Sequence, residues 1–325
     1  MSCFISSSMK VWAFFLSLFY FFSGPAVPPS TDDPIKAPSE DVKLNIVLWA
    51  DPQVSNYKFE RQPHFENACQ DINNAETEFD ALLAVGDVAE NGLLVEYEMI
   101  ANHIVSDNVK NYIMATGNHD VRMRAYKSTV KRFTAFTNRI NEAVGSEMKI
   151  DSLSYKTEIN GYTFIVLGAD RAEFEKSWFS QEQIDWLDES LKEASGSENP
   201  VFVLNHQPLQ GTHGLPEKWG SSMKFAGSLG KQSDKIFEIM NKYENVVFLT
   251  GHLHPGFSEY TYEKVGNIHS VNLPSLTIEG EYGYYTECGM GYIMEAYSDK
   301  VVFRARNFSQ GRFLPEYDIT LNFGE

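Results

Sequence analysis

The chain has 325 residues, of which 43% are hydrophobic and 14% aromatic, and this composition is typical of a globular protein with a sizeable core. Its formal net charge of -17 repels nucleic acids and anionic membrane surfaces at long range, so we expect neither as a partner. No internal linker or repeat of solenoid period interrupts the sequence after residue 43, which predicts one domain there.

The first 26 residues differ in composition from the rest and predict a secretory signal. Lys10 precedes a 12-residue run rich in Phe, Leu and Trp, from Val11 to Phe22, and Gly24-Pro25-Ala26 follows it as a small-x-small cleavage site. The run is short for a membrane span, although an uncleaved anchor through residues 11–22 stays an alternative. We therefore expect a signal peptide over residues 1–26, a flexible leader over 27–43 and one domain over 44–325. The exported protein should be secreted or lie in the lumen of the secretory pathway, without stable membrane association.

Five apolar runs have the composition of strands that are buried on both faces. The runs cover residues 44–50, 79–85, 112–116, 201–204 and 245–250. Residues between Arg61 and Thr77 are apolar at helical spacing, so this helix and the first two strands predict a βαβ unit with parallel strands. Asp51 and Asp87 should then lie at the same end of adjacent strands.

The remaining elements complete an α/β chain. Helical patterns cover residues 93–105, 125–144 and 233–243, and Ser180 predicts the start of another helix. Two strands over 153–159 and 162–168 flank Asn160-Gly161, which is the strongest hairpin signal in the chain. The runs at 268–273, 290–297 and 300–306 alternate as antiparallel strands do. Together these elements predict a four-layer α/β/β/α sandwich, in which helices flank two mixed sheets.

Three other features allow more than one interpretation. The stretch from Gln207 to Gly230 follows His206 directly and could select substrate at the mouth of a site, or be a mobile surface excursion. The basic residues of stretch 125–144 predict a solvated helix face rather than an anion site. Cys69 and Cys288 could pair outside the cytoplasm, and Asn307-Phe308-Ser309 is an acceptor sequence for N-glycosylation.

Gly117-Asn118-His119-Asp120 is the most informative stretch, because an amide, an imidazole and a carboxylate follow directly on the third strand. Taken alone, it also fits an ordinary turn. The other strand ends change this interpretation, because metal-binding side chains follow them too. If these strands are neighbours in one layer, their ends converge on one crevice with the composition of a metal site. That crevice would hold Asp51, Gln53, Asp87, Asn118, His206, His252 and His254.

These blocks, in this order, resemble the calcineurin-like metallophosphoesterase superfamily over residues 44–308. The matching blocks are Asp51-Pro52-Gln53, Gly86-Asp87, Gly117-Asn118-His119-Asp120, His206 and Gly251-His252-Leu253-His254. Gln53 is a departure, because most members have histidine there. An amide oxygen is a harder and weaker ligand than imidazole, so this position should favour Mn or Mg over Zn. No tyrosine follows shortly after Asp87, which argues against the purple acid phosphatase branch.

The resemblance implies a centre with two divalent metal ions, of which manganese is favoured and Mg, Fe or Zn would also fit. It assigns Asp51, Gln53 and His254 to the first ion and Asn118, His206 and His252 to the second, with Asp87 bridging both. A bridging hydroxide would attack phosphorus in a small phosphomonoester or phosphodiester.

Two further roles follow from the same resemblance. His119 would protonate the leaving oxygen or stabilise charge there, and Asp120 would orient His119 through a hydrogen bond. Arg122 lies close enough in the sequence to reach a substrate phosphate. The alternative to a hydrolase is a non-catalytic metal- or phosphate-binding protein that keeps the fold. Neither the substrate nor the oligomeric state is predicted by the sequence.

Overall fold

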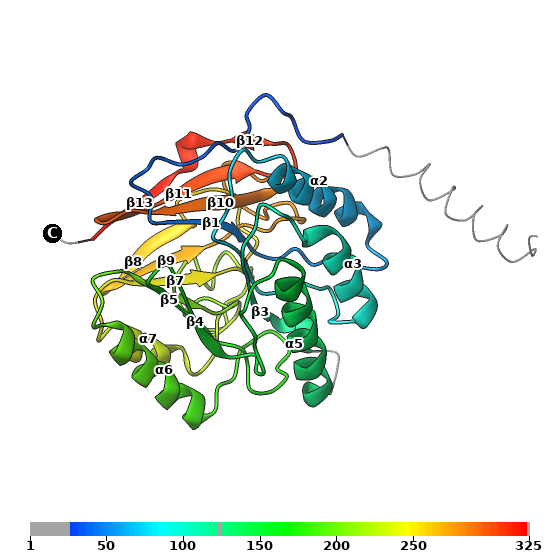
Figure 1. Cartoon of the computed structure of the whole chain (residues 1–325). Coiled ribbons are helices and arrows are strands. Elements are labelled where there is room, and N and C mark those ends of the chain that lie inside the picture. Colours follow the sequence, from blue (N-terminus) through cyan, green and yellow to red (C-terminus); the bar gives the residue numbers. More distant parts are fainter. Residues whose placement is uncertain (1–26, 123–124, 324–325) are drawn as a thin grey trace, which may run out of the picture.

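The computed structural model describes residues 27–122 and 125–323 (Figure 1). The predicted signal peptide lies outside the described residues. None of the helices in these two ranges combines the length and the apolar composition that a membrane crossing requires.

Seven of the described strands form a mixed sheet around the predicted βαβ unit. β1, β2 and β3 pair in parallel, and β10 pairs with β1 in the antiparallel direction. The strand order is β12-β11-β10-β1-β2-β3, and β13 also pairs with β11. The strands are β1 (Leu44–Trp49), β2 (Ala81–Val85), β3 (Tyr112–Ala115), β10 (Met290–Ala296), β11 (Lys300–Asn307), β12 (Arg312–Phe313) and β13 (Ile319–Asn322).

A second mixed sheet has six of the described strands in the order β4-β5-β6-β7-β9-β8. Its four middle strands pair in parallel, and the two edge strands β4 and β8 pair in the antiparallel direction. The strands are β4 (Tyr155–Ile159), β5 (Tyr162–Val166), β6 (Val201–Leu204), β7 (Val246–Thr250), β8 (Tyr262–Val265) and β9 (Ile268–Asn272).

Helices cover the outer face of each sheet, as Figure 1 shows. Helices α2, α3 and α5 lie beside the first sheet, and α6 and α7 lie outside the second. The helices are α2 (Gln62–Asn73), α3 (Leu94–Ile104), the short α4 (Asn118–Val121), α5 (Tyr126–Ala143), α6 (Gln181–Ala194) and α7 (Ser233–Met240), with 3-10 turns η1 (Phe59–Arg61) and η2 (Pro315–Tyr317). The predicted four-layer α/β/β/α sandwich is confirmed.

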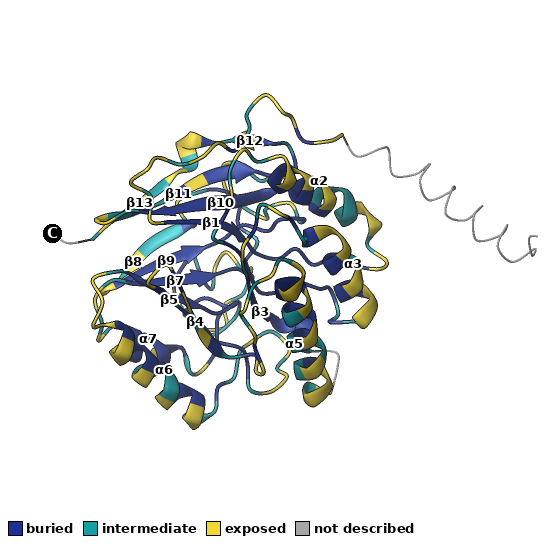
Figure 2. Cartoon of the chain, viewed as in Figure 1, coloured by how far each residue is buried: buried dark blue, intermediate teal, exposed yellow. Residues whose placement is uncertain are grey.

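Strands of the second sheet contribute side chains to two cores. Phe202 and Leu204 of β6 belong to the core between the sheets, whereas Val201 and Val203 pack with α6 and α7. Because both faces of such strands are covered, their sequences are continuous apolar runs instead of alternating ones. Figure 2 shows the result: the central strands of both sheets are buried, the edge strands β4, β8, β12 and β13 are partly exposed, and the helices are exposed on their outer faces.

Local signals predicted several elements well. The hairpin of β4 and β5 turns at Asn160 and Gly161, both of which have positive φ angles of 52° and 79°. Ser180 caps α6, because its side chain accepts a hydrogen bond from the N–H of Gln183 at 3.2 Å. Lys127, Lys131 and Arg139 on α5 are exposed, as expected for a solvated helix face.

The expectation of three successive antiparallel strands near the carboxyl end is wrong for the first of them. β9 belongs to the second sheet and pairs in parallel with β7, while its antiparallel partner is β8, which the sequence pattern did not predict. β10 and β11 do form an antiparallel pair. Whether a strand pairs in parallel or in the antiparallel direction depends on the sheet that it joins. The chain crosses from the second sheet to the first between β9 and β10, and the residue pattern does not indicate this crossover.

The flexible leader expected over residues 27–43 instead contacts the domain. Ile35 is buried, and its carbonyl accepts a hydrogen bond from the N–H of Glu76 at 2.8 Å. The N–H of Ser30 donates to the carbonyl of Gln310 at 2.9 Å. Composition indicated a loop correctly, but the loop is held against the first sheet and α2.

The two suggested covalent features are not supported. Cys69 and Cys288 are both free thiols. Asn307 is fully buried, and its amide donates to the hydroxyl of Tyr285 at 2.7 Å and the carbonyl of Cys288 at 2.9 Å. Its side chain therefore has no room for a glycan in the folded protein.

Candidate metal centre

Loops at the carboxyl ends of five parallel strands meet between the two sheets. β1, β2 and β3 belong to the first sheet, whereas β6 and β7 belong to the second, so the condition under which the ends were expected to converge, that all five strands are neighbours in one layer, does not hold. The ends converge nonetheless: the Nδ1 of His206, after β6, lies 2.8 Å from the carbonyl of Val85 at the end of β2. The other nitrogen of His206, Nε2, lies 3.0 Å from Asp87 Oδ2 and 3.5 Å from Asp51 Oδ1.

The backbone at this junction is strained. Asp51, Asp87 and His252 have φ angles of 50°, 47° and 73°, in the left-handed region that residues other than glycine rarely adopt. Gln53 and His254 share this feature, with φ angles of 35° and 45°. Left-handed residues of this kind each cost about 1–3 kcal/mol and cluster at functional sites, where the surrounding structure imposes them.

Gly117 provides space for the Asp87 carboxylate. A Cβ atom at this position would lie 2.1 Å from Asp87 Oδ1. The backbone N–H of His119, two residues further on, donates to the same Oδ1 at 2.7 Å. The close approach of the loop after β3 to Asp87 therefore requires a residue without a side chain.

Asp87, His206 and His252 form a cluster that fits a divalent cation. All three are buried, and their candidate ligand atoms lie within 4.8 Å of one another. The Nε2 of His252 is buried without a hydrogen-bond partner, which is rare for an imidazole nitrogen and expected of a metal ligand, while the Nε2 of His206 faces the carboxylates of Asp87 and Asp51. Asn118 lies beside them, and its Oδ1 accepts from Gln207 Nε2 at 3.2 Å.

The charges of this cluster also favour a cation. Burial by itself raises the pKa of Asp51 and Asp87, but the neighbouring imidazoles, chiefly that of His206, outweigh it and hold both pKa values below the ordinary value. Burial lowers the pKa of His206, yet the carboxylates of Asp87 and Asp51 together raise it to about 10. Burial, with the charge of His206, lowers the pKa of His252 to about 3. Two ionised carboxylates therefore attract positive charge to a place that also offers a neutral imidazole.

Gln53 has an orientation that does not suit a metal ligand. Its Nε2 lies 3.3 Å from Asp87 Oδ2 and 3.3 Å from the Nε2 of His254. Its Oε1 faces away and accepts a hydrogen bond from Arg61 at 2.9 Å. Because a guanidinium can only donate, Arg61 fixes the amide in this orientation. For its oxygen to bind an ion beside Asp87, the amide would have to rotate and lose Arg61.

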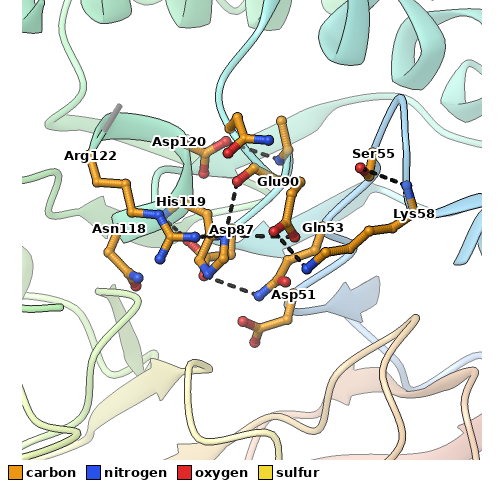
Figure 3. A network of polar contacts seen from close by, with 12 residues as sticks. Asp51, Gln53, Ser55, Lys58, Asp87, Glu90, Asn118, His119, Asp120 and Arg122 are labelled. Carbon is orange, nitrogen blue, oxygen red and sulfur yellow. Dashed lines mark hydrogen bonds and ion pairs between the residues drawn. The ribbon is translucent and has the colours of Figure 1, made fainter. Parts of the chain in front are cut away.

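His119 lies beside the cluster and contacts Glu90, which the sequence did not indicate, as well as Arg122 (Figure 3). Its Nε2 is 3.9 Å from Asp87 Oδ2, and its side chain is 16% exposed. Its Nδ1 lies 2.9 Å from the carbonyl of Glu90 and 2.8 Å from Arg122 Nη2. A protonated Nδ1 donates to the Glu90 carbonyl, whereas an unprotonated Nδ1 accepts from Arg122, so only one contact holds in each protonation state.

The expectation that Asp120 forms a hydrogen bond with His119 is wrong. The Asp120 carboxylate accepts instead from the backbone N–H groups of Gly117, Val88 and Ala89, at 3.0, 3.1 and 3.0 Å, and from the hydroxyl of Tyr97 at 3.1 Å. Burial, and then the charge of Asp87, raise the pKa of Asp120 to about 7. Asp120 therefore joins the loops after β2 and β3 instead of orienting an imidazole.

Glu90 is the acidic residue nearest to His119 that sequence analysis missed. Its Oε2 lies 3.7 Å from His119 Nδ1, and it pairs with Lys58 at 2.8 Å and Arg61 at 2.6 Å. The sequence signal that could have indicated Glu90 is its position three residues after Asp87, in the same loop. Nothing in that position alone distinguishes it from a solvated loop residue.

Loops of the second sheet complete the border of the cluster. Trp219, from the long stretch after His206, stacks on His252 with ring centroids 4.7 Å apart. Glu175 contacts the amide of Asn118 at 3.2 Å and Arg122 at 3.4 Å. His213 fixes the start of the long stretch, because its Nδ1 lies 2.7 Å from the Tyr260 carbonyl. The stretch therefore lies against the site, as one of its two interpretations predicted, and is held there.

The fold and these side chains define an α/β sandwich with a candidate metal site at the strand ends. Residues 44–256 match the calcineurin-like phosphoesterase family, and the chain belongs to this family. The resemblance inferred from the sequence blocks is confirmed.

Two curated relatives and one solved structure are similar to this chain. A 3',5'-cyclic-nucleotide phosphodiesterase of Nostoc sp. is 25% identical over 200 residues, which are 61% of this chain and 63% of that protein. A probable glycerophosphodiester phosphodiesterase of Arcobacter nitrofigilis is 23% identical over 191 residues, which are 58% of this chain and 61% of that protein. The chain thus matches less than two thirds of either relative. A dimetal phosphatase from Danio rerio has the same fold, with a TM-score of 0.57, 14% identity and coverage of 87% of this chain and 100% of that one.

Substituting Gly117 by alanine should disrupt the cluster. The backbone of Gly117 is extended, with φ of -110°, so alanine can adopt it, but its Cβ would lie 2.1 Å from Asp87 Oδ1, 2.5 Å from the Asp87 backbone nitrogen and 2.6 Å from His206 Cδ2, so both residues must shift. We expect Gly117→Ala to weaken manganese binding by about tenfold or more, measured by isothermal titration calorimetry. Gly196→Ala is the matched control, because its Cβ would have only an ordinary contact of 3.6 Å with Glu193. Unchanged affinity in Gly117→Ala would mean that Asp87 is not a ligand.

Substituting Gln53 by histidine should strengthen one of two metal positions. Imidazole is a better ligand for transition metals than an amide whose oxygen is held by Arg61, so the second equivalent of zinc should bind about tenfold more tightly in Gln53→His. Calorimetric titration of the wild type should show two unequal sites. Gln181→His, on the exposed start of α6, controls for the added imidazole. Two equally tight sites in the wild type would contradict this account of Gln53.

Proposed function

We propose that this protein is a metal-dependent phosphoester hydrolase with a dinuclear centre. The observation that carries the proposal is the buried cluster of Asp87, His206 and His252, in which the Nε2 of His252 has no hydrogen-bond partner. Membership of the calcineurin-like phosphoesterase family supports it.

The proposed ligands divide into two groups around Asp87. Asp51, Gln53 and His254 would hold one ion, Asn118, His206 and His252 the other, and Asp87 both. Oxygen ligands from carboxylates and amides favour manganese, while the three imidazoles also admit iron or zinc. Two divalent ions bound there would activate a water molecule and neutralise negative charge on the phosphoryl group.

His119 is the proposed proton donor. Its Nε2 is on the side of the Asp87 carboxylate, where the leaving oxygen of a phosphoester bound at the cluster would lie. To donate the Nε2 proton and end as a neutral imidazole, the ring must also be protonated on Nδ1, and Nδ1 then donates to the Glu90 carbonyl 2.9 Å away, which holds the ring in place. Arg122 is itself held by Glu175, so it adds a fixed positive charge at the edge of the cluster.

Phosphodiesters are the proposed substrates in preference to phosphomonoesters. Both curated relatives are named as phosphodiesterases, one for cyclic nucleotides and one for glycerophosphodiesters. A diester carries less charge than a monoester at neutral pH, which also suits a protein with a net charge of -17.

A non-catalytic metal- or phosphate-binding protein is the second candidate. The orientation of Gln53 favours it, because an amide held by Arg61 leaves one metal position weak. The retained imidazole of His119 beside Asp87 favours the hydrolase, since a binding protein needs no proton donor.

Export from the cytoplasm is the proposed localisation. The apolar run from Val11 to Phe22 and the small residues after it support a signal peptide over residues 1–26.

His119→Ala should lower turnover far more than metal content. We expect hydrolysis of bis(p-nitrophenyl) phosphate by the manganese-loaded protein to fall by about 10²- to 10⁴-fold, because a general acid contributes that much. His103→Ala, on the exposed surface of α3, is the control for losing an imidazole. Metal content is measured by inductively coupled plasma mass spectrometry. Equal loss of metal and turnover would remove the assigned role of His119, and no turnover by the wild type with any tested ion would favour the binding protein.

Expression of the full chain in a secreting host should yield a product that begins near Val27, determined by mass spectrometry of the intact protein. Deletion of residues 11–22 should abolish export. A membrane-bound product that keeps residues 1–26 would support the anchor instead.

A further inference from the structure

A cavity of about 430 Å³ lies directly beside the candidate metal centre. Its walls come from two loops of the second sheet, residues 173–176 and 219–227. Two of its residues also border the cluster: Glu175 contacts the amide of Asn118, and Trp219 stacks on His252. A group attached to a phosphoester bound at the cluster can therefore extend into this cavity.

The cavity has aromatic and apolar walls that are open to solvent. Phe174 and Met223 are 70% and 71% exposed, among the most exposed large apolar side chains of the described residues, and both line this cavity. Trp219 and Phe225 lie half-buried beside them. His252 covers one face of the Trp219 indole, so Trp219 lines the cavity with the part of its ring that His252 does not cover. Exposed apolar side chains gathered at one hollow mark a binding surface.

Both carboxylates of the cavity are already paired with arginines. Glu173 pairs with Arg171 at 2.7 Å, and Glu175 pairs with Arg122 at 3.4 Å. Lys176 and Lys224 also line the cavity. A quaternary ammonium group would therefore meet two lysines and carboxylates that are already paired. The cavity thus disfavours a cationic group.

We propose that this cavity binds a flat ring without positive charge on the substrate, so that the substrate class is a phosphoester with an aryl or heteroaryl group. This inference rests on the proposed hydrolase function. Flat rings stack on aromatic side chains, and a rigid ring loses less conformational entropy on binding than an alkyl chain of similar size. The Phe174 ring also packs against the guanidinium of Arg122, 5.6 Å from its centroid, which links the ring site to the edge of the cluster.

The test compares phenyl and cyclohexyl p-nitrophenyl phosphodiesters, which release the same p-nitrophenolate and differ in the planarity of the retained ring. In the manganese-loaded protein, Phe174→Ala should lower the ratio of kcat/KM for the phenyl ester to that for the cyclohexyl ester about fivefold. Comparing variant with wild type cancels the different intrinsic reactivities of the two esters. Phe174 is exposed, so its truncation should not destabilise the fold. Leu94→Ala removes an apolar side chain that is 60% exposed on α3 and should leave the ratio unchanged.

Binding of phenylphosphonate and cyclohexylphosphonate to the same manganese-loaded proteins, followed by calorimetry, separates this inference from the hydrolase proposal. If both esters are hydrolysed and Phe174→Ala does not change their ratio, the ring site is overturned and the hydrolase stands. If no ester is hydrolysed, the hydrolase fails. In that case, tighter binding of phenylphosphonate that is lost in Phe174→Ala upholds the ring site, and equal binding of the two phosphonates overturns it.

Discussion

Burial of two carboxylates at the junction of two sheets is the constraint on which the rest of this structure depends. Asp51 and Asp87 are 0% and 1% exposed, and removing such charges from water costs several kcal/mol each unless positive charge or hydrogen-bond donors surround them. Their compensation comes from both sheets: the imidazoles of His206 and His254, and the backbone N–H groups of His119 and His252. The two sheets are thus joined by electrostatics as well as by the apolar core between them.

The same constraint accounts for the unusual backbone around the cluster. Strands that end at slightly different depths can direct their next side chains to a common point only if the chain turns sharply, and left-handed residues provide such turns. Gly117 allows one loop to reach Asp87, and the Asp120 carboxylate holds that loop against the loop after β2. The strain is therefore opposed by hydrogen bonds placed beside it.

A second layer of contacts surrounds the cluster. The buried Glu90 forms ion pairs with Lys58 and Arg61. Arg61 in turn donates a hydrogen bond to the amide oxygen of Gln53. The opposite border contains Arg122, Glu175 and Trp219, and the last two also line a cavity with largely apolar and aromatic walls. The proposed metal affinity and the proposed choice of substrate thus involve different sides of the same centre, one polar and the other largely apolar.

The strands that end at the site, and their order along the chain, could be inferred from the sequence because the signals are local. An apolar run followed by Gly86-Asp87 or by Gly251-His252-Leu253-His254 carries both its secondary structure and its chemistry within a few residues. The layers followed from the same runs, since strands buried on both faces need helices outside each sheet. What only the tertiary structure decided is which side chains meet. Glu90, Glu175 and Trp219 come from loops without periodicity, and the partners of Asp120 and Gln53 depend on a neighbouring loop, because a hydrogen bond forms with the nearest suitable group in space whatever its distance along the chain.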